Sequence, residues 1–386
     1  MRHTLNVLTL ATLFLNACAS HAASTAAPSA TPEQSATSAP VAQATTKRCQ
    51  LVQPIAPAPS VATAINDNGD VTGASNGVAF RWSDGVLTRI GTLPWDSDTP
   101  PTSIGYGINT SGIVVGASGT YEQETSAPDR QSQGFIYPQP NLKALFSDDT
   151  RTVRSSPSEA AMAINDANVI VGNDGSAAFV SIPDMPEDVG TDLESDSFHR
   201  SIATAIDSRG EVVGASSLRQ RSNELHPYLW ARTSRNPTPV DLGLPHGYHA
   251  GIATGIANGM IVGYTSTTPD LTSGWLRSPQ TADFVGLPYT GVAWRWYNSS
   301  MQTLASRHGA RHSAALGTGD VGAIVGTSDN HAMLWRDTLA LDLNDWLGRQ
   351  HAWTLQVARG INRRGWIVGN GLFNGAPTAF LFHLCP

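Results

Sequence analysis

Apolar residues in this chain gather in short runs separated by turn residues, and the same arrangement returns seven times. Each unit reads approximately Ile-Asn-Asp-x-Gly-x-Val-Val-Gly, so two apolar runs flank a polar turn. Two short runs joined in this way predict a β-hairpin. Self-similarity at a period of roughly 40 to 60 residues is typical of propellers and solenoids. The closing glycines of the seven units are Gly73, Gly116, Gly172, Gly214, Gly263, Gly326 and Gly369.

The fourth residue before each closing glycine is a glycine six times and an asparagine once. These two residue types best tolerate a positive φ, so the position predicts left-handed backbone in a tight hairpin turn. The predicted turn residues are Gly69, Gly112, Asn168, Gly210, Gly259, Gly322 and Gly365. Side chains just before the turn can cap it through hydrogen bonds to the backbone. The capping candidates are Asn66, Asn109, Asn165, Asp207 and Asn362.

A second hairpin follows each first one. Its third strand carries aromatic residues, as in 78–82, and a fourth strand follows, as in 87–93. Four antiparallel strands in each of seven repeats predict an all-β fold, a seven-bladed β-propeller. The last repeat ends at its third strand, so we expect the strand that starts at Cys49 to complete the last blade.

The repeat spacing is broken once. Gly263 and Gly326 are 63 residues apart, and the segment 291–296 nearly copies 77–82, which makes it the third strand of its repeat. The excess, about 264–290, is either an inserted hairpin or the remnant of an eighth blade. We favour seven blades with an insertion.

The N-terminus resembles an export signal. An apolar run from Leu5 to Leu15 is too short for a transmembrane span and fits a signal-peptide core. The run ends at Leu15, and the four residues Leu15-Asn16-Ala17-Cys18 resemble a bacterial lipobox. We therefore expect 1–17 to be a lipoprotein signal peptide and acylated Cys18 to hold the protein in the outer membrane, on its periplasmic or surface face. The alternative is ordinary cleavage near Ala22, which would give a soluble periplasmic or secreted product.

Residues 18–46 are mainly Ala, Ser, Thr, Pro and Gln, a composition that predicts a disordered tether. The propeller is expected to span 47–386. Besides Cys18, the chain has only Cys49 and Cys385, which bracket this region. We expect them to form a disulfide in an oxidising compartment, because they lie on strands predicted to pair; two free thiols are the alternative.

Composition and motifs argue against several classes of function. The net charge is −7 and no basic patch is present, which argues against nucleic-acid binding. The pairs His246–His249 and His308–His312 lack a third ligand in sequence, and the Asn-Asp turns lack the oxygen-ligand pattern of a calcium loop. No catalytic motif is present either. We expect no metal and no cofactor, and we assign no catalytic residue.

The units resemble those of the HAF family of extracellular repeat proteins of bacterial envelopes. The resemblance covers about residues 50–384, from the Ile-Asn-Asp turns through Ala-Phe-x-Trp to the Leu-Gly-x-Leu step, seen as 90–93 and 242–244. The sixth repeat departs from the pattern, with Thr318-Gly319 in place of Ile-Asn. The resemblance implies a secreted, non-enzymatic, propeller-like protein and supplies no catalytic residues.

A four-stranded meander places the loops after strands two and four on one face, here named the long-loop face. The turns after strands one and three lie on the other, the tight-turn face. Binding residues usually lie on long loops. Candidates with acidic or aromatic side chains, suited to a sugar, a cation or a basic peptide, are Trp95, Asp96, Asp98, Asp148, Asp196, Tyr248 and Trp353.

Three functional hypotheses remain open. The first is a monomeric, non-enzymatic module that binds an envelope polysaccharide or protein through the long-loop face. The second is a scaffold within an envelope complex. The third is a polysaccharide hydrolase or lyase that uses Asp96, Asp98, Asp148 and Asp196 as acid and base.

Overall fold

The computed structural model describes residues 52–94, 100–120, 131–145, 159–174, 177–181, 191–193, 201–217, 225–231, 239–267, 290–319, 322–337, 339–347 and 352–383. The chain divides into two compact units, Met1–Arg48 and Cys49–Pro386, and all described residues belong to the second. Within these ranges no helix combines the length and the apolar character that a membrane crossing requires.

The strands form seven four-stranded antiparallel sheets, named blades one to seven in chain order. Blade one contains β2 (Ser60–Ile65), β3 (Val71–Ser75), β4 (Val78–Ser83) and β5 (Val86–Gly91). Blade two contains β6 (Thr102–Ile108), β7 (Val114–Thr120), β8 (Gln131–Tyr137) and β9 (Lys143–Ala144). Blade three contains β10 (Glu159–Ile164), β11 (Ile170–Asp174), β12 (Ala178–Ser181) and β13 (Thr191–Asp192). Blade four contains β14 (Ser201–Ile206), β15 (Val212–Ser217), β16 (Leu225–Trp230) and β17 (Pro239–Asp241).

The remaining blades follow the same order. Blade five contains β18 (Ala250–Ala257), β19 (Met260–Ser266), β20 (Ala293–Tyr297) and β21 (Ser300–Thr303). Blade six contains β22 (Ser313–Thr318), β23 (Ala323–Ser328), β24 (His331–Arg336) and β25 (Leu339–Asp342), followed by the 3-10 helix η1 (Leu343–Trp346). Blade seven contains β26 (Trp353–Ile361), β27 (Ile367–Phe373) and β28 (Ala376–Phe382), with β1 (Val52–Pro54) as its outer strand. The prediction of a seven-bladed β-propeller is confirmed.

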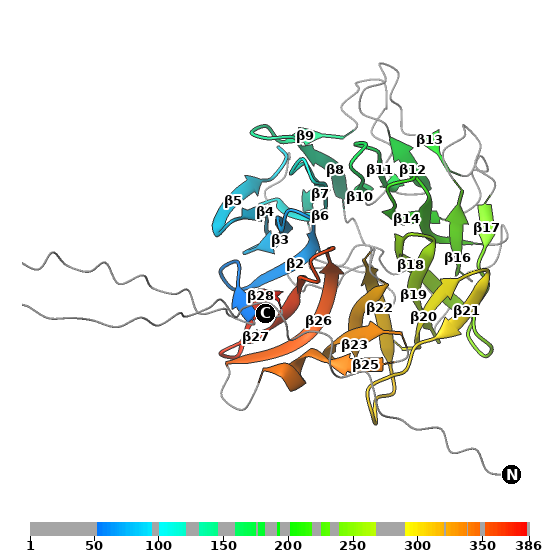
Figure 1. Ribbon diagram of the computed structural model, residues 1–386. Coiled ribbons are helices and arrows are strands. Elements are labelled where there is room, and N and C mark those ends of the chain that lie inside the picture. Colours follow the sequence, from blue (N-terminus) through cyan, green and yellow to red (C-terminus); the bar gives the residue numbers. More distant parts are fainter. Residues whose placement is uncertain are drawn as a thin grey trace, which may run out of the picture. The chain divides into compact units, whose positions relative to one another are not determined.

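The blades form a closed ring. Figure 1 shows the first strand of every blade nearest the centre, and each first strand contacts the next, with β2 contacting β26 to close the ring. Seven of the buried apolar clusters each join two adjacent blades, one cluster for each of the seven junctions. An eighth takes residues from six blades, including Val61, Ile104 and Ile252. Burial between blades is therefore what holds the ring together.

The N-terminal strand completes the last blade, as the sequence predicts. β1 pairs antiparallel with β28, with Val52 opposite Phe382 and Gln53 opposite Leu381. Beyond the strand, the N–H of Ile55 donates to the carbonyl of Ala379 at 3.2 Å. Cys49 and Cys385 lie outside the described residues, so their pairing stays a prediction.

The described residues of the long repeat form one four-stranded blade. β19 pairs with β20, and Gly263 lies opposite Trp294, as expected for a second and third strand. β19 continues to Ser266, so the insertion begins later than residue 264. Most of the predicted insertion, 268–289, lies outside the described residues.

The hairpin turns owe their shape to the predicted residues. The seven turn residues all have positive φ, between 61° and 96°. The Asn66 side-chain oxygen accepts hydrogen bonds from the N–H groups of Asn68 and Asp70, at 3.0 and 2.9 Å. The same pair of bonds occurs at three other capping residues, Asn165, Asp207 and Asn362.

These asparagines also link neighbouring blades, which the repeat pattern alone does not reveal. Asn66 Nδ2 donates to the carbonyl of Asn109 at 2.8 Å, and Asn109 Nδ2 donates to that of Asn165 at 3.3 Å. Asn165 continues the series to Asp207 at 3.1 Å, and Asn362 closes it onto Asn66 at 3.0 Å. An amide side chain is needed because it accepts with one atom and donates with the other.

A β-bulge interrupts the first hairpin of every blade. In blade four the register shifts between Ala203 and Ala205, so Thr204 is the extra residue. Gly214, the closing glycine, lies opposite Ala203, and a Cβ there would lie 1.8 Å from the Ile202 carbonyl oxygen. The other six closing glycines face the same obstruction, with the equivalent distance between 1.9 and 2.1 Å. The closing glycine is therefore required because two backbones approach too closely for any side chain.

Candidate functional site

Most of the binding candidates on the long-loop face lie outside the described residues. These are Trp95, Asp96, Asp98, Asp148 and Asp196. Tyr248 is described and half-buried in the connection between β17 and β18, where its N–H donates to the carbonyl of Pro245 at 3.3 Å. Its role as a ligand contact on this face stays a prediction.

Trp353 is not a surface residue, which corrects its assignment as a ligand contact. It is 4% exposed at the start of β26 and belongs to the cluster between blades six and seven. Its ring centroid lies 4.8 Å from that of Phe373 and 6.2 Å from that of Phe380. The blade that follows the loop buries the ring, and this burial depends on contacts that loop position does not predict.

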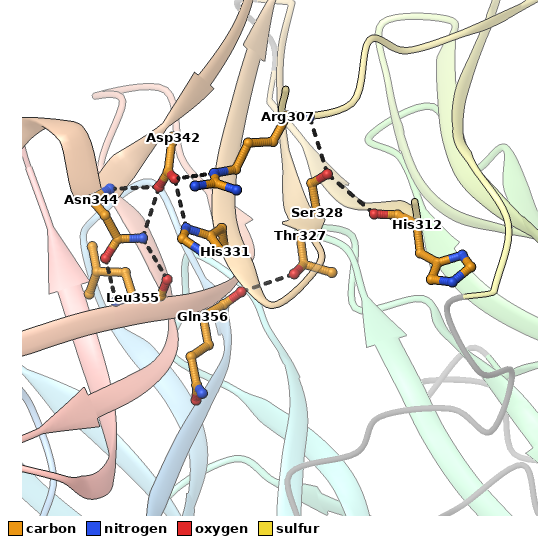
Figure 2. Close-up of polar contacts among 9 residues, drawn as sticks. All are labelled: Arg307, His312, Thr327, Ser328, His331, Asp342, Asn344, Leu355 and Gln356. Carbon is orange, nitrogen blue, oxygen red and sulfur yellow. Dashed lines mark hydrogen bonds and ion pairs between the residues drawn. The ribbon is translucent and has the colours of Figure 1, made fainter. Parts of the chain in front are cut away.

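The long-loop face of blade six carries a polar cluster, and Figure 2 shows its contacts around Asp342. Arg307 Nε donates to Asp342 Oδ2 at 3.1 Å, and His331 Nδ1 lies 2.7 Å from the same oxygen. Asp342 Oδ1 accepts from the Asn344 N–H and Nδ2 groups, at 2.9 and 2.8 Å. Asn344 in turn bonds to both backbone groups of Leu355.

This cluster bonds the segment between blades five and six to blade six. Arg307 lies in the segment that leads from blade five into blade six, and Asp342 caps η1. The N–H groups of Arg311 and His312 donate to the carboxylate of Asp329, at 2.8 and 3.0 Å. Blade four has an equivalent pair, His226 and Asp241, at 3.1 Å. Through these contacts the cluster joins the connecting segment to blade six and, by way of Asn344, to β26 of blade seven.

The pKa values in the cluster follow from these contacts. Burial of Asp342 opposes its ionisation, but hydrogen bonds from Asn344 and the charge of His331 outweigh this, so its pKa is lowered. For Asp329, the backbone N–H of Arg311 contributes most to a lowered pKa. Both carboxylates are therefore stabilised in the ionised form.

We expect Asp342→Asn to lower the free energy of unfolding by about 2 kcal/mol at pH 7, because Arg307 and His331 lose the charged carboxylate oxygen that they share. The folded pKa of Asp342 is lower than the unfolded value, so its contribution is present above the unfolded pKa and is lost as the pH falls through the folded pKa. The two proteins should therefore converge in stability towards pH 3. Urea unfolding at both pH values measures this, with Asp84→Asn, in an exposed turn, as the charge-matched control. An equal loss at both pH values would contradict the assignment.

The second candidate is a pocket at the centre of the ring. It has a volume of about 240 Å³ and is lined by the first strands of all seven blades. In each first strand, the lining residues lie mainly between the β-bulge and the hairpin turn that follows the strand. The pocket is therefore in the half of the ring nearer the tight-turn face. The bulge residues that line it are Thr63, Tyr106, Met162, Thr204, Thr254, Leu316 and Arg359.

Three of the bulge residues are threonines that link blades. The hydroxyl groups of Thr63 and Thr204 donate to carbonyls of the next blade, each at 2.6 Å, and Thr254 does so at 2.8 Å. Their methyl groups are then left to line the pocket together with the Met, Leu and Ile side chains. The wall of the pocket is therefore mainly apolar.

Arg359 alone is charged among the described residues that line this pocket. It is 8% exposed, and its Nε donates to Asn370 Oδ1 at 3.2 Å, which fixes the guanidinium beside β27. A guanidinium in an apolar pocket pairs strongly with a carboxylate or phosphate, because little water competes there. The guanidinium of Arg359 therefore favours a ligand with an anionic group in this pocket.

Sequence inspection missed this pocket, although a signal was present. In six repeats the bulge residue stands ten positions before the closing glycine, and nine in the fifth. The position carries Thr, Tyr, Met, Leu or Arg within an otherwise constant frame. A variable position inside a constant repeat indicates a residue that is not needed for the repeat itself.

The described residues contain no group of three or more His, Cys, Asp or Glu residues that could hold a metal ion. His246, His249 and His308 are exposed, and His312 is half-buried.

No protein-family model and no curated protein sequence matches this chain. Among solved structures, it is similar to a streptogramin B lyase, with a TM-score of 0.50 and 10% identity over 86% of this chain and 97% of that one. It is also similar to the β-propeller domain of the Trilobed protease from Pyrococcus furiosus, with a TM-score of 0.46 and 10% identity over 84% of this chain and 93% of that one. At such identities the similarity shows the propeller fold alone.

Proposed function

We propose that this protein is a non-enzymatic binding module of the bacterial envelope that takes an anionic group into its central pocket. The observation that carries this proposal is the position of Arg359. In a frame repeated seven times, one variable position from each blade meets at the centre, and one of these seven residues is a buried arginine. Ligands commonly bind in pockets of this kind, where an apolar wall surrounds a few polar groups.

The size of the pocket limits what it can hold. Its volume of about 240 Å³ is below the ~300–1,000 Å³ of sites for drug-sized ligands. The occupant is therefore a small organic acid or the anionic end of a larger molecule. An apolar body fits the wall formed by Met162, Leu316 and the isoleucines, and the carboxylate or phosphate pairs with Arg359.

The location proposed here rests on the N-terminal pattern and on the resemblance to HAF-repeat proteins. An acyl chain on Cys18 would hold the protein in the outer membrane. The 18–46 tether has a root-mean-square reach of roughly 30 Å if it is a flexible coil. The propeller would then bind ligands near the membrane surface. In the alternative, cleavage near Ala22 gives a soluble exported protein with the same propeller but without the lipid anchor.

The hydrolase or lyase hypothesis depends on Asp96, Asp98, Asp148 and Asp196, all outside the described residues. No contact among the described residues favours it. It stays a prediction, and its test is a loss of polysaccharide turnover when one of these residues becomes asparagine.

We expect hexanoate to raise the thermal unfolding midpoint of the wild-type protein, because a ligand that binds only the folded state stabilises it by mass action. Hexanol, with the same apolar body and no charge, should raise it less. Arg359→Met should abolish the difference between the two probes, and Arg359→Lys should keep part of it because the charge remains. Arg89→Met, which removes an exposed guanidinium, is the matched control.

Circular dichroism checks that the Arg359 variants are folded before the comparison is made. An equal response to hexanoate in wild type and in folded Arg359→Met would contradict the proposed site. No response of the wild type to hexanoate or to inorganic phosphate would contradict anion binding at the pocket altogether.

A further inference from the structure

The asparagine bridges run from blade one to blade four and from blade seven to blade one, and a groove on the tight-turn face lies outside this run, between blades five and six. The fifth blade has a shorter first turn than the others: Ala257 pairs directly with Met260, and Asn258 and Gly259 form a two-residue turn with φ of 50° and 77°. This turn lacks the capping position that carries asparagine in other blades.

The sixth blade also lacks a bridging side chain. Its turn keeps the longer form, since the Gly319 N–H donates to the Ala323 carbonyl and the Gly322 N–H to that of Gly319, each at 3.1 Å. Gly319 therefore stands where Asn66 stands in blade one, and it has no side chain to bridge to blade seven. Because the short turn of blade five has no capping position, no asparagine bridge of this kind joins blades five and six among the described residues.

A cavity of about 490 Å³ lies at this junction. The first turns of the two blades line it, together with the second hairpin of blade five and Asp337 of blade six. Its volume lies within the ~300–1,000 Å³ that is usual for small-molecule sites. We name it the Tyr297 groove, after the aromatic residue at its edge.

Tyr297 is an aromatic residue with an unusually exposed side chain. It is 51% exposed, and the other exposed large apolar residues in the described part of the chain are all aliphatic. It ends β20 and is presented by a two-residue turn, Asn298-Ser299, in which both residues have positive φ. An exposed aromatic ring beside a cavity offers a flat apolar surface to a ligand.

The polar groups around Tyr297 include one positively and one negatively charged side chain. Arg295 Nε and Nη2 donate to Gln302 Oε1 at 3.2 and 3.0 Å, and Nη1 lies 3.5 Å from the Asp337 carbonyl oxygen. Arg295 is the positive side chain in the lining, and Asp337, which also lines the cavity, is the negative one. Ser300 and Asn258 add a hydroxyl and an amide. Such a set both donates to and accepts from a neutral polyol.

We propose that the Tyr297 groove binds a neutral oligosaccharide of β-linked pyranoses, with one ring stacked on Tyr297. Equatorial hydroxyl groups leave the C–H face of such a ring free for stacking, while the hydroxyls at its rim reach Arg295, Gln302 and Asp337. The groove and the central pocket share no lining residue. Sugar binding in the groove therefore does not depend on anion binding in the central pocket. It rests on the proposed function only because both make the protein a binding module.

The test is calorimetric titration of the full-length protein with chitotriose and cellotriose. The wild type should bind at least one of them. Tyr297→Ala should weaken that binding about tenfold or more, and Tyr297→Phe should keep it, because the ring supplies the contact. Val86→Ala, which removes another exposed apolar side chain, should change nothing.

The proposal is overturned if neither trisaccharide binds, or if Tyr297→Ala binds as the wild type does. Because Tyr297 is exposed, its replacement should leave the thermal midpoint unchanged, and this is measured first. The response to hexanoate separates the two proposals: a normal response with no sugar binding overturns only the groove. A lost response to hexanoate with sugar binding intact overturns only the central pocket.

Discussion

Replacing Gly214 by alanine is expected to lower the free energy of unfolding by about 3 kcal/mol or more. The new Cβ would lie 1.8 Å from the Ile202 carbonyl oxygen and 2.9 Å from its carbonyl carbon. Both obstructing atoms belong to the backbone of the innermost strand, so no rotamer change relieves the contact. The blade must separate at its bulge, and the bulge is where the hydroxyl of Thr204 links blade four to blade five at 2.6 Å.

The matched control is Gly85→Ala. Gly85 has a φ of 86°, and a Cβ added there would meet no atom within 4 Å, so alanine costs only the backbone strain of about 1 kcal/mol. Urea unfolding of the two variants gives both numbers. A loss at Gly214 no larger than that at Gly85 would mean that the bulge adjusts, and that the close backbone approach is not what requires glycine.

Reduction of the oxidised protein is expected to lower its stability by an amount on the order of 5 kcal/mol, if Cys49 and Cys385 form the predicted disulfide. The register of β1 and β28 supports this pairing, because a continuation by three residues beyond Val52 and Phe382 places the two cysteines opposite each other. Directly opposite residues in an antiparallel pair have Cα atoms about 4.5 to 5.5 Å apart, which a disulfide can span. The bond would close a loop of more than 300 residues and lock the ring.

Thermal unfolding with and without a reducing agent measures this effect. Cys385→Ser should unfold at the midpoint of the reduced wild type and should not respond to the reducing agent. A wild-type midpoint that is insensitive to reduction, together with two titratable thiols, would show that the ring is closed by strand pairing alone.

The sequence alone determined the elements of this fold and their order. Hairpins, turns and capping side chains depend on residues a few positions apart, so the positive φ of Gly69 and the bonds from Asn66 to its own turn follow from a local pattern. Counting such units predicted seven blades. The missing fourth strand of the last repeat placed β1 beside β28.

The tertiary structure decided which residues meet. The sequence pattern predicts Trp353 in a connecting loop, yet it is the first residue of β26, where Phe373 and Phe380 pack against it. The second hydrogen bond of Asn66, to the next blade, depends on how two sheets pack. Arg359 reaches a central pocket only because the bulges of all seven blades line the same cavity. Local patterns fix the backbone of each blade, whereas the pocket at the centre and the groove at Tyr297 arise from contacts between residues tens to hundreds of positions apart.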